Sequence, residues 1–337
     1  TKFTNQGQKY RSYVLTGYDA ASPYLVPGRN FSAYGTSGAN WSTIARIQRR
    51  LPYASGIGLL GTQRSYFDGG SGSLVAADVN LRLSDALRLK AEVAFSDTRE
   101  PNASWITGGE NFKGRTAALD GERFQGIAMY SGLVRQSKHW TLRADVMGQS
   151  PTFRAEMGFE PQNDWMRYEL SASYNGFPNK KWIKTWGVYN EATQYRYFDG
   201  DLRQNHHLAW GWIQWGGNLR SSFFHRVRFD EVFKDVRYSN LRTLGTNLNW
   251  RPSQTFNAGI EYNTGQSIAY NETELRVGRE ANVSLDFQIQ VGGQLRWNHM
   301  IVHSEMQELD GSALIYRGFI YRSGLEWSMS RATELRF

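Results

Sequence analysis

Charged side chains recur at every second position in several segments of the chain, between apolar residues. Asp78 and Arg82 lie in one such segment, and Arg88, Lys90 and Glu92 lie in the next. Alternate residues of a β-strand point to the same face, so these charges would line one polar surface. We assign the following residues to that surface: Asp78, Arg82, Arg88, Lys90, Glu92, Arg143, Asp145, Arg167, Glu169, Arg228, Glu261 and Asp286; Arg226 follows the same pattern.

Two kinds of chemistry fit a polar surface of this composition. A row of cations could form a pore or binding surface that selects anions. Charges of both signs on neighbouring strands could instead form ion pairs that stiffen a solvated interior. We favour the second interpretation, because mixed signs do not make a clean selectivity ring.

Tryptophans gather in one part of the sequence, namely Trp182, Trp186, Trp210, Trp212 and Trp215. Stacked indole rings could bind the faces of sugars along a path. They could also belong to the aromatic girdle that membrane β-proteins place at the boundary between lipid and water. Because aromatic enrichment at that boundary is general, we predict that the five residues are girdle residues.

The histidines and serines give only weak signals for metal binding or catalysis. His206 and His207 are adjacent, and Glu191 is near them in sequence. Neighbouring residues of a strand point to opposite faces, so one metal ion rarely binds both imidazoles. A serine esterase needs a positioned Ser–His pair with an orienting third group, and the Ser and His spacings here are at chance level. With no cysteine in the chain, we predict no catalytic residue, no metal site, no cofactor and no enzyme activity.

The elements that must position these residues are strands. Apolar and polar residues alternate through Ser73–Ser84 and again through Leu87–Phe95, and the same period recurs downstream. Tight turns at 52–55, 84–86, 137–139, 178–181, 216–220, 251–254 and 292–293 separate longer polar loops at 68–72, 98–120, 150–164, 193–205, 234–240, 264–273 and 304–312. This rhythm is typical of bacterial membrane barrels. We predict an all-β, antiparallel up-and-down transmembrane β-barrel, a single domain over 1–337 with about sixteen strands.

The composition agrees with a membrane β-barrel and limits the classes of molecule that could be its binding partners. The chain has 337 residues, of which 40% are hydrophobic and 14% aromatic, with a net charge of +8. A run of about 18 apolar residues, as a membrane helix requires, does not occur. The basic residues are spread along alternating strand positions, so we expect no nucleic-acid partner. Outer-membrane lipid and anionic lipopolysaccharide are the partners that fit external Lys and Arg residues, and other outer-membrane or periplasmic proteins are further candidates.

The end of the chain suggests a larger barrel. Ser330–Thr333 has the composition of another tight turn, and Glu334–Phe337 would open a strand. That strand holds only a few of the roughly nine residues needed to cross a membrane. We therefore expect an incomplete barrel: either the natural polypeptide continues past Phe337, or another chain supplies the missing strands.

Several segments resemble an uncharacterised family of bacterial outer-membrane proteins. The resemblance covers most of the chain from about Ser12 and depends chiefly on Arg46, Asp78 and Gly158-Phe159. Its further segments are 40–51, 55–62, 77–82 and 157–164. The family implies a large C-terminal β-barrel preceded by a domain like family-9 carbohydrate-binding modules. It supplies no catalytic residues.

Three classes of function follow from these observations. The chain could be a channel or transport barrel, a barrel that anchors a partner, or an outer-membrane enzyme or carbohydrate-associated surface protein whose chemistry lies outside this segment. An enzyme would need a convergent site that the sequence does not contain. We therefore expect transport or anchoring in the outer membrane of a Gram-negative bacterium.

Overall fold

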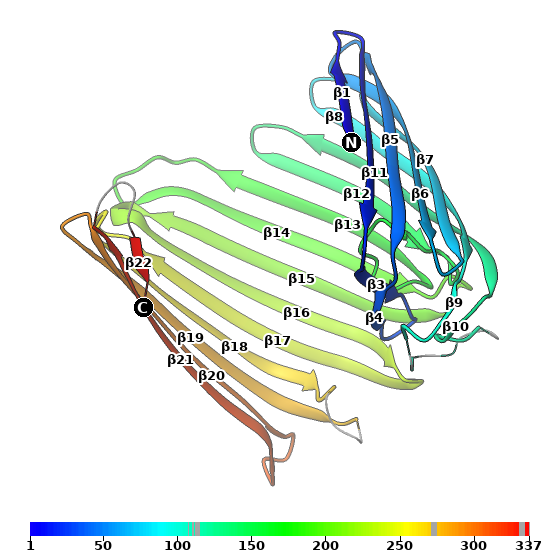
Figure 1. Ribbon diagram of the computed structural model, residues 1–337. Helices are drawn as coiled ribbons and strands as arrows, with labels where there is room; N and C mark the ends of the chain where they lie inside the picture. The colour runs from blue at the N-terminus through cyan, green and yellow to red at the C-terminus, as the bar shows by residue number, and fades with distance from the viewer. Residues whose placement is uncertain (107, 110, 112–114, 271–274, 330–333, 337) are drawn as a thin grey trace.

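The chain folds into one wide, curved antiparallel sheet whose strands follow one another in chain order (Figure 1). The computed structural model describes residues 1–106, 108–109, 111, 115–270, 275–329 and 334–336. The strands of the sheet are β1 (Lys2–Gln6), β2 (Tyr10–Asp19), β5 (Asn40–Leu51), β6 (Ser55–Tyr66), β7 (Ser71–Arg82), β8 (Leu87–Arg99), β11 (Arg123–Gln136), β12 (Trp140–Gln149), β13 (Trp165–Gly176), β14 (Ile183–Arg196), β15 (Leu202–Trp215), β16 (Leu219–Phe233), β17 (Val236–Trp250), β18 (Phe256–Ile268), β19 (Val277–Val291), β20 (Leu295–Glu308), β21 (Leu314–Ser328) and β22 (Glu334–Arg336). The predicted all-β, up-and-down antiparallel fold is therefore confirmed.

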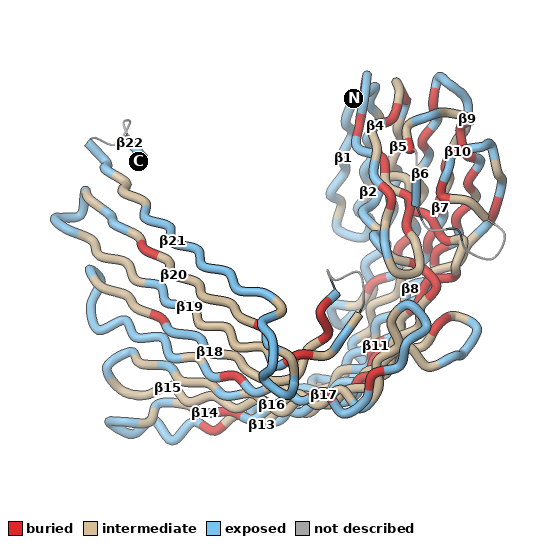
Figure 2. Tube along the Cα trace, turned by 90° about the horizontal axis from the view of Figure 1, so that it is seen from below, coloured by how far each residue is buried: buried red, intermediate tan, exposed pale blue. Residues whose placement is uncertain are grey.

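The sheet is an open trough with two edges (Figure 2). β1 pairs only with β2, and β22 pairs only with β21, so within the described residues the two edges do not pair with each other. The turn predicted at Ser330–Thr333 lies outside the described residues. Continuation past Phe337 stays a prediction.

Alternation gives the sheet two different faces. Leu74, Ala76 and Ala94 lie on the inner face, where Phe153 from a long connection packs against them. Val75 and Phe95, one residue away, lie on the outer face and are 62% and 57% exposed. Cross-strand partners share a face, so this assignment carries from strand to strand through the register.

The connections differ between the two ends of the strands. One end, which we call the turn end, has tight turns such as 84–86 between β7 and β8. The other end, which we call the mouth, has the longer connections. The predicted loop at 234–240 is wrong, because only Lys234 and Asp235 lie between β16 and β17, both with positive φ as in a tight hairpin turn. The loops predicted at 193–205 and 304–312 are likewise mostly strand. Their polar composition misled the prediction, although the strand ends there include buried residues such as Thr193 and Met306.

Three connections fold together over the mouth, and we call them the mouth cap: the described residues of 20–39, 100–122 and 150–164. They contain two small sheets, β3 (Ser22–Val26) with β4 (Ala33–Ser37) and β9 (Asn102–Ala103) with β10 (Leu119–Asp120). Tyr24, Tyr66 and Trp105 form a cluster of three rings with centroids 5.2–5.7 Å apart. The cap also contacts the hairpin of β16 and β17, because the ring centroids of Phe31 and Phe233 lie 5.8 Å apart.

Helix is nearly absent from the described residues. Gly216–Asn218 forms a single 3-10 turn, η1, between β15 and β16. The described part of the chain contains no helix long and apolar enough to cross a membrane.

Candidate functional site

All twelve charged residues assigned to the polar surface lie on the inner face. The register shows this directly, since Asp78 lies opposite Glu92, Asp145 opposite Glu169, and Asp286 opposite Gly259. The remaining members follow through the same chain of cross-strand partners. A single surface therefore carries Asp78, Arg82, Arg88, Lys90, Glu92, Arg143, Asp145, Arg167, Glu169, Arg228, Glu261 and Asp286. Whether it faces a lumen stays a prediction.

Several of these charges form ion pairs with each other. Arg143 contacts Asp145, whose buried carboxylate also accepts a hydrogen bond from Tyr130 at 3.2 Å. Arg167 lies 3.5 Å from Glu169. The inner face therefore carries internally compensated charge over β12 and β13.

Other members bind partners outside the predicted set or have no ion pair. Asp78 pairs with Arg46 at 2.6 Å, and Arg228 pairs with Glu231 at 2.7 Å. Arg82 pairs with Asp85 in the tight turn, at 3.0 Å. In the described part of the chain, no ion pair involves the remaining members: Arg88, Lys90, Glu92, Glu261 and Asp286. Glu261 instead accepts a hydrogen bond from Asn263.

The five predicted girdle tryptophans do not share a face. Trp186 and Trp215 lie on the outer face, and Trp182 lies in the turn before β14. Trp210 and Trp212 lie on the inner face, so their assignment to the girdle is wrong. Leu208 lies opposite Glu191, which is on the inner face, so Leu208 is also on the inner face. Trp210 and Trp212 follow Leu208 at steps of two residues, and alternate residues of a strand share a face.

A different set of tryptophans forms the outer aromatic row at the turn end. Each lies on the outer face close to the turn-end terminus of its strand: Trp140, Trp186, Trp215, Trp250, Trp297 and Trp327. The ring centroids of Trp140 and Tyr174 lie 5.0 Å apart, and those of Trp250 and Phe256 lie 6.0 Å apart. Local clustering in sequence was the wrong signal. The set could have been predicted from two features of each residue: its distance in sequence from a tight turn, and its place in the alternation between inner and outer face.

The two adjacent histidines point to opposite faces. His206 Nε2 lies 3.5 Å from Glu191 Oε1 on the inner face, and His207 lies on the outer face. Glu191 also accepts hydrogen bonds from Tyr189 and Thr193. These contacts give both oxygens of the Glu191 carboxylate a protein partner.

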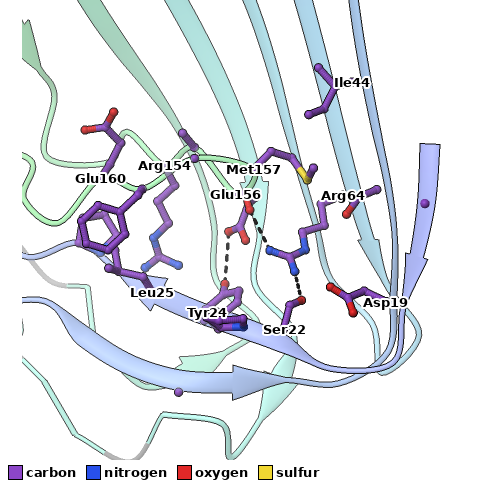
Figure 3. A pocket seen from close by; sticks show the side chains of 18 of the residues that line it. Asp19, Ser22, Tyr24, Leu25, Ile44, Arg64, Arg154, Glu156, Met157 and Glu160 are labelled. Carbon is purple, nitrogen blue, oxygen red and sulfur yellow. Dashed lines mark hydrogen bonds between the residues drawn. The ribbon is translucent and has the colours of Figure 1, made fainter. Parts of the chain in front are cut away.

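The mouth contains a cavity of about 630 Å³ between β2, β3 and residues 154–160 (Figure 3). Arg64, which is 8% exposed, projects into it from β6. Its guanidinium donates to Asn40 Oδ1 at 3.1 Å, to the Glu156 carbonyl at 2.9 Å, and to Ser22 Oγ. Tyr24 donates to the Glu156 carboxylate at 3.3 Å. Burial raises the pKa of the Tyr24 phenol, and Glu156 raises it further, so Tyr24 keeps its proton and remains a donor.

Three carboxylates meet beside this cavity. The ligand oxygens of Glu100, Asp120 and Glu122 lie within 4.8 Å of one another, and sequence reasoning missed the group. Glu100 is buried and pairs with the buried Arg154 at 2.5 Å. Burial raises the pKa of Glu100 despite the opposing effect of Arg154. Since Arg154 belongs to residues 150–164, this ion pair links two segments of the mouth cap.

Comparisons with known proteins give likeness in fold alone. No family model matches the chain, and no curated protein sequence matches it. The structure of OccAB2 from Acinetobacter baumannii is similar, with a TM-score of 0.45, 12% identity, and coverage of 97% of this chain and 98% of that chain. The siderophore receptor PiuA from the same organism gives a TM-score of 0.37 and 7% identity, and covers 99% of this chain and 76% of that chain.

Proposed function

We propose that the chain forms the wall of a β-barrel in the outer membrane of a Gram-negative bacterium, and that its inner face lines a path for solutes. The observation that carries this proposal is the division between the two faces. Leu170, Phe319 and Val75 point outward and are 65%, 66% and 62% exposed. An apolar surface of this extent needs a lipid or protein environment, whereas the charged inner face needs water.

The outer aromatic row at the turn end supports an orientation. Tryptophan side chains favour the boundary between hydrocarbon and water, because the ring is apolar and its N–H needs a polar partner. In bacterial barrels the tight turns lie on the periplasmic side. The turn end is therefore periplasmic in this proposal, and the mouth cap is external.

Lipopolysaccharide is the partner that we propose at the mouth. Arg99 is exposed on the outer face at the mouth end of β8, and Arg242 is exposed on the outer face of β17, eight residues toward the mouth from Trp250 of the outer aromatic row. Anionic headgroups would bind there. The double change R99Q/R242Q is expected to lower the lipopolysaccharide that co-purifies with the protein. R296Q, which alters an inner-face residue near the turn end, should leave that amount unchanged; equal loss in both variants would contradict the assignment.

Passage of solutes is preferred to anchoring of a partner, because residues such as Asp286 and Glu261 are exposed on the inner face of β18 and β19. The proposal includes no catalytic activity and no cofactor. Membership of the outer-membrane family with a domain like family-9 carbohydrate-binding modules, and the further strands that it implies, stay part of the proposal.

Cysteine labelling tests the orientation of the two faces. The chain contains no cysteine, so a single introduced thiol has no background. In vesicles, V93C is expected to react with a lipid-soluble maleimide and E92C with a water-soluble one, because the two positions lie on opposite faces of β8. The reverse pattern would mean that the faces are exchanged. Ion conductance across a planar bilayer then tests the path itself, and a folded, inserted protein without conductance would contradict passage.

A further inference from the structure

The outer face of the sheet carries an apolar groove over β5, β6, β7 and β8, which lie side by side (Figure 1). The groove has a volume of about 650 Å³. Two rows of cross-strand partners line it: Ile47, Leu59, Ala77 and Val93 in one row, and Arg49, Ile57, Val79 and Ala91 in the other. Ala77 lies between Leu59 and Val93, so a short side chain separates two longer ones. In the proposed barrel this hollow faces hydrocarbon, and it needs an apolar occupant.

The polar end of the groove lies toward the turn end. Arg49 is two residues from the end of β5 and is the cross-strand partner of Tyr10 on β2, and both residues border the groove. Arg49 is exposed, and within the described residues its side chain forms no ion pair and no hydrogen bond. Asp78 and Glu92 also border the groove, but their side chains lie on the inner face, where Asp78 pairs with Arg46. In the described part of the chain, this cation on the apolar face thus has no anionic partner.

The surrounding corner of the sheet is strongly basic. Residues 1–67 contain eight Lys and Arg residues but one acidic residue, Asp19, so they carry most of the net charge of +8. Asp19 lies at the mouth end of β2, at the opposite end of the strand pair from Arg49. The turn that contains Lys9 lies beside β5, because the Arg50 amide donates to the Lys9 carbonyl at 2.8 Å. A corner with this charge attracts an anion.

We propose that this groove, which we call the outer groove, binds an anionic phospholipid of the periplasmic leaflet. One acyl chain lies along the apolar rows, and the phosphate accepts hydrogen bonds from the Arg49 guanidinium, which matches it in shape and charge. Tyr10 at the same end suits the boundary between hydrocarbon and water. The inference rests on the proposed function, which places the turn end at the periplasmic leaflet. The lipopolysaccharide proposed at the mouth lies in the other leaflet and is a separate partner.

Lipid binding is measured by native mass spectrometry on the full chain released from non-ionic detergent, which gives the number of bound lipids and their dissociation constants. Phosphatidylglycerol is the probe, compared with phosphatidylethanolamine of the same acyl chains and with soluble glycerol phosphate. Phosphatidylglycerol is expected to bind about tenfold more tightly than phosphatidylethanolamine, as one charge-assisted contact implies. Equal affinity for the two lipids would overturn the anionic headgroup. Equal affinity for phosphatidylglycerol and glycerol phosphate would overturn the role of the apolar rows.

Two pairs of variants test whether the outer groove is the site. R49Q is expected to remove the preference for phosphatidylglycerol, whereas R135Q, which alters an exposed outer-face arginine at the turn end of β11, should keep it. A77L fills the groove and is expected to weaken the binding of both lipids about tenfold. A144L, at an outer-face alanine of β12, should leave both affinities unchanged. Circular dichroism checks the strand content of each variant. Unchanged binding of phosphatidylglycerol in both R49Q and A77L would overturn the proposal.

Other outcomes separate the outer groove from its alternatives. Dimers in the same spectra that A77L dissociates would assign the groove to a second copy of the chain and overturn the lipid. Expected labelling of V93C and E92C in vesicles, together with no preference for phosphatidylglycerol, refutes the outer groove alone. Exchanged labelling of V93C and E92C refutes the proposed function, and the inference with it.

Discussion

Replacing Arg64 with methionine is expected to release the mouth cap from the sheet. The guanidinium is buried and donates hydrogen bonds to Asn40, Ser22 and the Glu156 carbonyl, so its loss removes three charge-assisted hydrogen bonds that join the cap to the sheet. Loss of buried hydrogen bonds from a charged donor costs about 1.5–3 kcal/mol. Amide hydrogen exchange should therefore accelerate in Ser22–Val26 and in 154–158.

Arg123→Met is the matched control for this change. Arg123 pairs with Asp97 at 3.0 Å, but its side chain is 68% exposed. Exposed ion pairs contribute about 0–1 kcal/mol, so exchange in the mouth cap should stay close to that of the unmodified protein. If R64M and R123M gave the same exchange rates, the Arg64 network would not be what holds the cap.

Replacing Leu170 with arginine is expected to lower the stability of the protein in lipid vesicles by about 2–4 kcal/mol. Leu170 lies on the outer face in the middle of β13, where a charged side chain would face hydrocarbon. Ser173→Arg, three residues further along the same strand, adds the same side chain to the inner face. Urea unfolding in vesicles should show a large loss for L170R and a small one for S173R. Equal losses would contradict the proposal that the outer face contacts lipid.

The faces of the sheet could be predicted because the period of a strand is two, whatever the tertiary structure. Glu92 and Val93 needed only their positions in an alternating run to be placed on opposite faces. Trp210 and Trp212 were misplaced for the opposite reason. Their interpretation used their density in sequence and the base rate for membrane proteins, although Trp215, at an odd spacing from both, could not share their face.

The mouth could not be predicted in the same way. Tyr24 and Glu156 are 132 residues apart in sequence and form one hydrogen bond. Arg64 lies among polar residues of a strand, where nothing in its neighbourhood indicates that a loop 92 residues away covers it. Burial of this kind arises from long-range packing, which leaves no periodic trace in the chain. Glu100 was missed for the same reason, because its partner Arg154 lies in another connection.

The mouth cap also implies an order of assembly. β19, β20 and β21 pair only with strands that are next to them in sequence. Each of these strands can therefore be added to the sheet in turn by closing a short loop. The segments of the cap instead form hydrogen bonds across more than a hundred residues, and these contacts form only when all the segments are present. Folding of the first half is thus expected to be all-or-none, whereas the last hairpins can join, fray and rejoin one at a time.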